Sequence, residues 1–87
     1  MSLDAYLEFP CDFPLKVLGH HEQDFDAVIA TVVRKHVSDL SEGAVVTRPS
    51  SAGRFVSVTV HIRAESQQQI EAIYRDLHAT PGVLMLL

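Results

Sequence analysis

Hydrophobic and polar residues alternate most regularly along residues 54–64. The side chains that share one face of this segment are aliphatic: Val56, Val58, Val60 and Ile62. A period of two residues is that of a β-strand with one packed face and one exposed face. Residues 13–19 alternate in the same way, and Gly19 then marks a change of chain direction. Two strands are therefore predicted, each with one face in the core.

The period lengthens to three and four residues in the segment from residue 22 to about residue 37. Its apolar stripe consists of Phe25, Val28, Ile29, Val32, Val33 and His36. Such a stripe is typical of an amphipathic helix. The acidic residues Glu22, Asp24 and Asp26 lie at its start, where we expect them to cap the helix and complement its dipole.

A second helix is predicted to begin after Ser66. Ser66 is a good N-cap residue, and Gln69 three residues later completes a capping box. The apolar positions Ile70, Ile73, Tyr74 and Leu77 recur at helical spacing. The pair Pro81-Gly82 is a turn signal that ends the helix.

Shorter β-prone runs at residues 44–48 and 83–87 complete the order β-α-β-β-α-β. Two amphipathic helices separated by a hairpin are best housed on one face of an antiparallel sheet. The predicted fold class is therefore α+β, a ferredoxin-like four-stranded antiparallel sheet with two helices on one face. Right-handed crossovers place the first and third strands in the centre. Residues 1–87 are expected to form one domain, with residues 1–12 as an N-terminal arm.

The composition narrows the class of protein. With 87 residues, 47% of them hydrophobic, the chain suits one globular domain that has little core to spare for a deep cavity. A net charge of −4 with only seven Lys and Arg residues disfavours nucleic acid as a partner. The single cysteine, Cys11, has no second cysteine for a disulfide or a metal pair. With no secretory signal and no apolar run of the ~20 residues that a bilayer needs, a cytoplasmic location without membrane contact is expected.

Three strings of residues resemble the YbeD-like family of small bacterial proteins: residues 7–10, residues 16–19 and residues 48–58. The third string, in which a Pro-Ser-Ser-x-Gly loop leads into Phe-x-Ser-Val, is the most specific. The resemblance spans nearly the whole chain. It implies the ferredoxin-like fold and a likeness to ACT-type regulatory domains, and it carries over no catalytic residue.

The loop at residues 49–53 is a first candidate ligand site. Hydroxyl groups, a flexible glycine and flanking cations suit a carboxylate or a phosphate, through the residues Arg48, Ser50, Ser51, Gly53 and Arg54. The alternative is an ordinary hairpin loop made of turn residues.

The segment from Gly19 to Glu22 is a second candidate, because ACT-like domains often bind amino-acid effectors at this junction. Gly19 and His20 would lie beside a helix N-terminus, which suits an anion, although the acidic residues nearby oppose one. His20 and His21 point apart on an extended segment, and the other histidines show no ligand spacing. No metal and no cofactor is therefore expected.

The uncovered face of the sheet is a candidate interface. The residues expected to form it are Leu18, Phe55, Ser57, Thr59, His61, Leu84 and Leu86, with Lys16 and Arg63 on the same face. Apolar side chains among polar ones are typical of an interface, and an apolar edge strand invites strand addition. A homodimer or another protein partner is expected here. The alternative is that the arm covers part of this face with Tyr6, Leu7 and Phe9.

These observations favour a regulatory or adaptor module, ACT-like, that binds a small-molecule effector or a protein partner. Catalysis is not expected, because the serines lie in caps and turns and the charge of Asp12 opposes a thiolate at Cys11. One alternative is a purely homo-oligomeric interaction module without a ligand. Another is an RNA-binding domain, since the fold also serves RNA recognition, but the first strand offers Lys16 and Leu18 where stacking needs aromatic rings.

Overall fold

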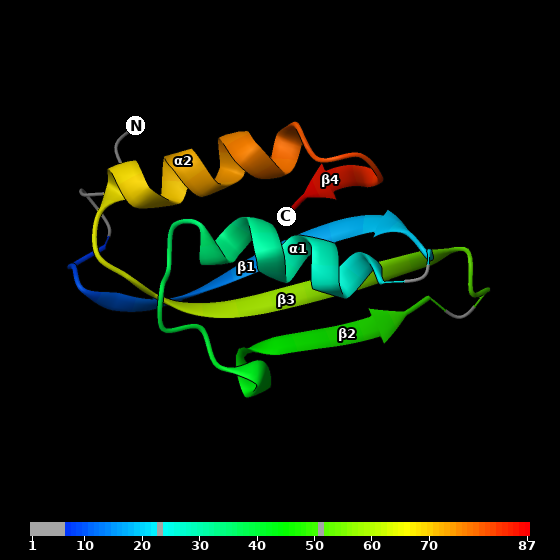
Figure 1. Cartoon of the computed structure of the whole chain (residues 1–87), viewed down its shortest axis with the longest axis horizontal. Helices are drawn as coiled ribbons and strands as arrows, with labels where there is room; N and C mark the ends of the chain where they lie inside the picture. The colour runs from blue at the N-terminus through cyan, green and yellow to red at the C-terminus, as the bar shows by residue number, and fades with distance from the viewer. Residues whose placement is uncertain (1–6, 23, 51) are drawn as a thin grey trace.

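The elements follow the predicted order in the computed structural model, which describes residues 7–22, 24–50 and 52–87 (Figure 1). They are β1 (Cys11–His20), α1 (Phe25–Arg34), the 3₁₀ turn η2 (Glu42–Ala44), β2 (Val45–Pro49), β3 (Phe55–Ala64), α2 (Gln67–His78) and β4 (Val83–Leu86). The first strand begins inside the segment predicted as an arm, because the alternation of its side chains already starts at Cys11. The η2 turn leads directly into β2.

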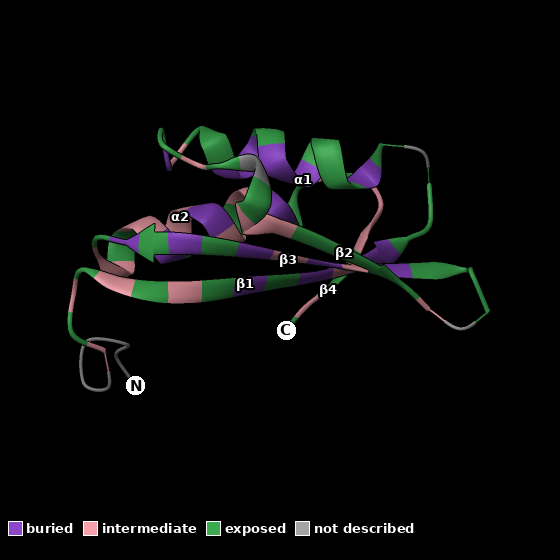
Figure 2. Cartoon of the chain, turned by 90° about the horizontal axis from the view of Figure 1, so that it is seen from below, coloured by how far each residue is buried: buried purple, intermediate pink, exposed green. Residues whose placement is uncertain are grey.

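The sheet has the order β2-β3-β1-β4, and every neighbouring pair is antiparallel. The first and third strands are central, as the crossover rule predicts. Both helices cover one face, and no described element covers the other (Figure 2). The ferredoxin-like α+β fold is thereby confirmed.

The core lies between the helices and the sheet. Its largest fully buried side chains come from all these elements: Leu15, Val17, Ile29, Val33, Val58, Val60, Ile70, Ile73 and Leu77. Leu7 and Phe9 pack against this same core cluster, so this part of the arm does not cover the open face. Tyr6 lies outside the described residues.

Val28 was expected in the core, and this prediction is wrong, because its side chain is 43% exposed. Phe25, Ile29 and Val33 define the buried stripe of α1. Val28 precedes Ile29 by one position and therefore lies about 100° around the helix from it. Its side chain therefore lies at the margin of the buried stripe.

The two helix starts differ from each other. Ser66 caps α2 by accepting a hydrogen bond from the Gln69 amide at 3.1 Å, as predicted. The Gln69 side chain accepts a hydrogen bond from the backbone amide of Glu65 at 2.7 Å. In a standard capping box the donor would be the amide of Ser66, one residue later. At α1 the predicted acidic cap is wrong: Asp24 is the N-cap residue, but its side chain accepts no capping hydrogen bond. Its φ of 66° lies in the left-handed region, which costs a non-glycine residue about 1–2 kcal/mol.

A polar contact joins the two helices. The His36 Nε2 atom lies 2.6 Å from the Asp76 Oδ2 atom, and the Gln69 side chain donates to the His36 carbonyl at 3.0 Å. His36 was predicted on the apolar stripe, and the structure places it half-buried at the C-terminal side of that stripe. Asp76 and Gln69 are both on α2, so the ring and the carbonyl of His36 together tie the end of α1 to that helix.

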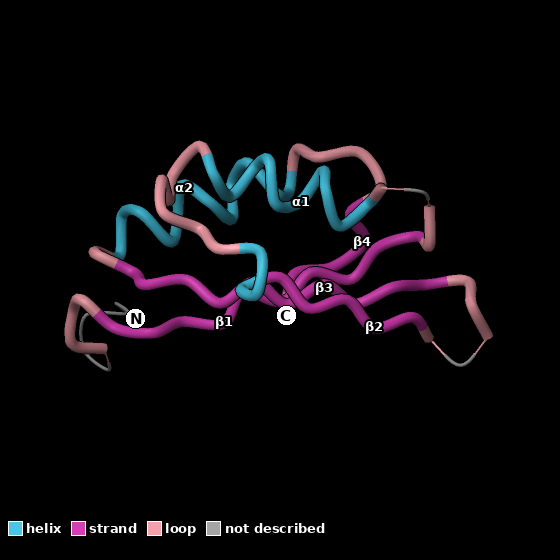
Figure 3. The backbone as a smooth tube through the Cα atoms, turned by 60° about the horizontal axis from the view of Figure 1, so that its bottom comes forward, coloured by secondary structure: helices cyan, strands magenta, loops and turns pink. Residues whose placement is uncertain are grey.

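The edge strand β4 contains a β-bulge, which changes the face of the sheet on which its later side chains lie. Val83 lies opposite Gly19 and Met85 lies opposite Leu18, so Leu84 is an extra residue in a bulge. Leu86 then lies opposite Val17, on the face that the helices cover. The expectation that Leu86 belongs to the open face is therefore wrong, and Met85 shares that face with Leu18 instead. Figure 3 shows β4 as a short strand beside β1, which is much longer.

No helix within the described ranges is both long enough and apolar enough to cross a membrane.

Candidate functional site

The junction between β1 and α1 meets the loop between β2 and β3 at one end of the sheet, on the right in Figure 1. The His21 amide donates to the Arg54 carbonyl at 2.9 Å, and the His21 Nδ1 atom lies 3.0 Å from the Gly53 carbonyl oxygen. Between the two segments lies a hollow of about 590 Å³, lined by His20, His21, Glu22, Gly53, Arg54 and Phe55. We call it the His20–Arg54 hollow. The two candidate ligand sites of the sequence thus lie side by side, and each contributes residues to one hollow.

The polar groups of the His20–Arg54 hollow suit a ligand that carries an anionic group. Because a carbonyl oxygen only accepts, the contact with Gly53 requires a proton on Nδ1 of His21, which leaves Nε2 as an acceptor in the neutral ring. Arg54 is exposed and has no ion pair among the described residues. Its guanidinium group can bind a carboxylate or a phosphate through two parallel hydrogen bonds. Glu22, on the rim, can receive an ammonium group.

An aromatic contact forms one wall of the hollow. The rings of His20 and Phe55 lie 5.9 Å apart between centroids, with 35° between their planes. The strand register explains the contact, because His20 at the end of β1 lies opposite Phe55 at the start of β3. The wall gives an apolar surface beside the charged groups, as small-molecule sites usually have.

The other candidate ligand residues have different places. Gly19 is buried, and a Cβ atom there would overlap the Phe25 ring and lie 2.7 Å from the Gly82 carbonyl oxygen, so its role is to make room for packing. Ser50 builds the turn: its hydroxyl accepts from the Phe55 amide at 3.3 Å and its carbonyl accepts from Gly53. Arg48 lies on the open face, away from Arg54. Ser51 lies outside the described residues.

The sequence-based prediction included His21 and Glu22 in the second candidate segment without naming either as a ligand residue, and it did not place Phe55 in a ligand site. The individual role weighed for His21 was that of a metal ligand, and Phe55 was assigned to an interface. The contact between residues 21 and 53 spans 32 positions of the chain. A single sequence carries no signal for such a contact beyond the strand order, which brings the two loops to the same end of the sheet.

The open face carries most of the predicted interface residues. Leu18, Phe55, Ser57, Thr59 and His61 all lie on it, because their neighbours along the strands face the helices. Leu84 is 47% exposed at the edge of the sheet. A second hollow, of about 530 Å³, opens in the middle of this face and is lined by Lys16, Val46, Arg48, Ser57, Thr59 and His61. We call it the open-face hollow.

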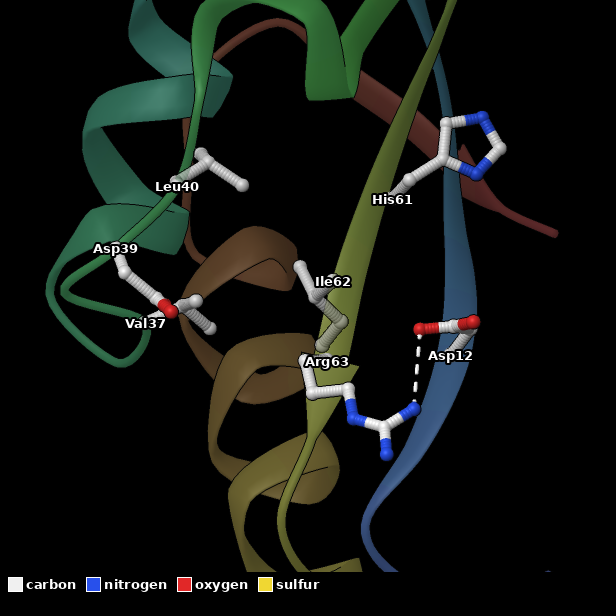
Figure 4. A pocket seen from close by; sticks show the side chains of 7 residues that line it. All are labelled: Asp12, Val37, Asp39, Leu40, His61, Ile62 and Arg63. Carbon is white, nitrogen blue, oxygen red and sulfur yellow. Dashed lines mark hydrogen bonds and ion pairs between the residues drawn. The ribbon is translucent and has the colours of Figure 1, made fainter.

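A third hollow, of about 380 Å³, lies at the other end of the sheet (Figure 4). Arg63 reaches from β3 to Asp12 on β1, and the Nη1 and Oδ1 atoms lie 3.3 Å apart. Ile62 points to the other side of the strand, toward Val37. Both charged side chains are largely exposed, so the pair adds at most about 1 kcal/mol to stability. The lining includes two carboxylates, Asp12 and Asp39, which makes this hollow the weaker candidate for an anionic ligand.

A fourth, more apolar hollow lies between α2 and the C-terminal strand, lined by Tyr74, His78, Leu86 and Leu87. Burial raises the pKa of the Tyr74 phenol above its ordinary value of 10.0. As the pH rises, the unfolded chain therefore loses this proton before the native protein does. The native state then binds more protons than the unfolded state, so the free energy of unfolding falls as the pH rises above about 10.

We expect Tyr74→Phe to remove this contribution. Urea denaturation at pH values from about 9 to about 11 measures the free energy of unfolding. This free energy should fall less steeply with rising pH in the variant than in the parent chain. At neutral pH the two proteins should have nearly the same stability, since Tyr74 makes no hydrogen bond through its hydroxyl group among the described residues. Parallel curves over the whole pH range would contradict the assignment.

Within the part of the chain that the structure describes, no three His, Cys, Asp or Glu side chains come together as metal ligands would. Cys11 is a free, half-buried cysteine at the start of β1.

The chain belongs to the family described as "Protein of unknown function (DUF493)", whose sequence profile matches residues 4–87. It is 42% identical to a UPF0250 protein of Paraburkholderia phytofirmans, over 97% of this chain and 94% of that protein. It is 49% identical to a UPF0250 protein of Chromobacterium violaceum, over 92% of this chain and 90% of that protein. These matches confirm the resemblance to small bacterial proteins that the sequence strings indicated.

The fold is also similar to the solution structure of protein HP0495 from H. pylori. The TM-score is 0.71, and the alignment covers 100% of this chain and 94% of the other, with 14% sequence identity. At this level of identity the likeness shows a shared fold, and it assigns no function to any residue.

Proposed function

We propose that this protein is a regulatory or adaptor module without catalytic activity, which binds a small effector carrying a carboxylate or phosphate group in the His20–Arg54 hollow. One observation carries the proposal. Two segments that are distant in sequence are joined through His21, and Arg54 forms no ion pair with any described residue beside their contact.

The electrostatics of the hollow support an effector with a small anionic group. Arg54 supplies a permanent positive charge. Glu22 opposes a multiply charged anion but complements an ammonium group. A zwitterion such as an amino acid therefore matches the hollow at both ends, with its carboxylate on Arg54 and its ammonium group toward Glu22.

The location of the hollow supports a regulatory role. It involves the start of α1, where Asp24 holds an unfavourable backbone conformation. A ligand that contacts His20 and Arg54 ties the β1–α1 junction more firmly to the β2–β3 loop. Such a ligand stabilises the folded state and alters the surface at this end of the sheet, which is how a small module can transmit binding to a partner.

A thermal-shift screen tests the proposal. The purified protein, at fixed concentration, is melted with amino acids, dicarboxylates, nucleotides and inorganic phosphate. A ligand present at 100 times its dissociation constant adds about 2.7 kcal/mol of stability, which raises the melting temperature of a domain this small by several degrees.

The Arg54→Gln variant locates the site. We expect affinity for the stabilising ligand to fall by about tenfold, which corresponds to loss of one charged hydrogen-bonded contact. Arg75→Gln is the matched control, because Arg75 is also exposed but lies on α2. The proposal would be contradicted if no compound in the screen raised the melting temperature, or if both variants lost the same affinity for the ligand.

A further inference from the structure

The open face of the sheet is basic, although the chain as a whole is acidic. The sequence has 11 acidic and 7 basic residues. The strand register directs Lys16, Arg48 and Arg63 to the open face. Within the described strands, Asp12 is the acidic residue that shares this face, and it pairs with Arg63. No acidic side chain of the described strands therefore balances the charges of Lys16 and Arg48 on this face.

Lys16 and Arg48 both line the open-face hollow. Lys16 lies opposite Thr59 on β3, and Arg48 lies opposite Ser57 on the same strand. Each cation thus has a hydroxyl group beside it. Ammonium, guanidinium and hydroxyl groups all donate hydrogen bonds to carboxylate oxygens. The hollow offers these donors from three adjacent strands without an acidic side chain among its lining residues.

Apolar side chains lie around these donors. Val46 is 41% exposed, Phe55 is 38% exposed and Met85 is 52% exposed. Met85 lies opposite Leu18, and Leu18 lies opposite Ser57. These apolar side chains therefore stand in the same row across the sheet as Ser57 and Arg48. Aromatic, methionine and arginine side chains are enriched where proteins bind one another. The composition of the face therefore matches a protein partner.

We infer that the open face docks an acidic peptide segment of a partner protein, whose carboxylates pair with Lys16 and Arg48 and whose apolar side chains contact Val46, Phe55 and Met85. Charge complementarity selects this occupant, because a basic face on an acidic protein attracts acidic segments and repels basic ones. This site shares Phe55 with the His20–Arg54 hollow, but its cations, Lys16 and Arg48, do not line that hollow, so variants at Lys16 and Arg48 and a variant at Arg54 test the two proposals independently.

The same face is poorly suited to RNA. Recognition of single-stranded RNA by such sheets needs aromatic rings on both central strands, on which bases stack. Among the described strands, β3 supplies Phe55 to the open face, whereas β1 supplies Lys16 and Leu18 within the strand and the smaller ring of His20 at its end. The Phe55 ring is moreover in contact with the ring of His20. Two unpaired cations are also few for binding a phosphate backbone.

A fluorescence anisotropy titration tests the inference. The probe is a labelled peptide of glutamate and leucine, and the control peptide has lysine in place of glutamate. The test variant is Lys16→Gln with Arg48→Gln. The matched control is Lys35→Gln with Arg75→Gln, which removes the same charge from exposed positions of the helical layer. All four side chains are exposed, so both variants should fold, and circular dichroism verifies this.

The expected result is that the acidic peptide binds and the lysine peptide does not. Affinity falls by about tenfold in the open-face variant and by less than about twofold in the helical-layer variant. Added salt weakens the binding, because surface charges are screened.

Three outcomes would overturn the inference. Equal losses in the two double variants would show that only the total charge matters. Tighter binding of an oligouridylate, lost in Phe55→Ala, would assign the face to nucleic acid. A dimer in sedimentation that buries this face and excludes the peptide would assign it to a second copy of the chain.

Discussion

Replacing Leu15 with alanine is expected to lower the free energy of unfolding by about 2–5 kcal/mol. Leu15 is fully buried on the central strand β1, where it lies opposite Val60. Truncation removes apolar atoms from the core and leaves a cavity. The central strand β1 is held in the sheet by its hydrogen-bonded neighbours, so it cannot move to fill this cavity. In a domain of 87 residues this is a large part of the total stability.

Lys16→Ala is the matched control, one position along the same strand. Lys16 is exposed on the open face, so its loss should change stability by no more than about 0.5 kcal/mol. Urea denaturation of both variants measures the difference directly. Similar costs at the two positions would mean that β1 does not separate a core face from an open face.

Replacing Gly19 with alanine is expected to cost about 1–3 kcal/mol through overpacking. The added methyl group would overlap the buried ring of Phe25 and lie 2.7 Å from the carbonyl oxygen of Gly82. The ring of Phe25 can move only by disturbing the core, and the carbonyl belongs to the backbone of the turn before β4. The backbone at Gly19 is not in the left-handed region, so the cost arises from lack of space.

Gly43→Ala is the control for this prediction, since a Cβ atom at Gly43 has no heavy atom within 4 Å. The two variants are compared by thermal and urea denaturation. A Gly19→Ala variant as stable as Gly43→Ala would show that the β1–α1 junction is looser than the structure indicates. Such looseness would also remove the fixed geometry on which the His20–Arg54 hollow depends.

Much of the fold follows from periodicity. The alternation along residues 55–64 places Val58 and Val60 in the core with full burial, as the sequence predicts. The capping box at Ser66 fixes the start of α2 within one residue. These features are local, and local physical chemistry determines them almost completely.

The errors arise where the outcome depends on tertiary contacts. The bulge at Leu84 shifts β4 by one residue, which turns Leu86 toward the helices instead of the open face. A strand of four residues is too short for its own pattern to specify the register. The same limit applies to Asp24, whose left-handed backbone conformation cannot be read from its type alone.

The candidate site was predictable in part. Arg54, Gly53 and His20 were each proposed as ligand residues on chemical grounds, and the fold brings them to one hollow. Arg48 was grouped with Arg54 because both flank the same loop. The strand register instead directs Arg48 across the sheet toward Lys16, where the two cations form a different surface.

Amide-resolved NMR titration of the full chain tests the central claim most directly, which is that this domain acts by binding at the end of its sheet. The probes are glutamate, succinate and inorganic phosphate, added separately. The account predicts that at least one of them shifts the amide signals of residues 20–22 and 53–55 in a concentration-dependent manner, and that Arg54→Gln raises the concentration needed for half the change by about tenfold. Shifts that are absent for all three probes, or that are spread evenly over the exposed amides, would contradict it.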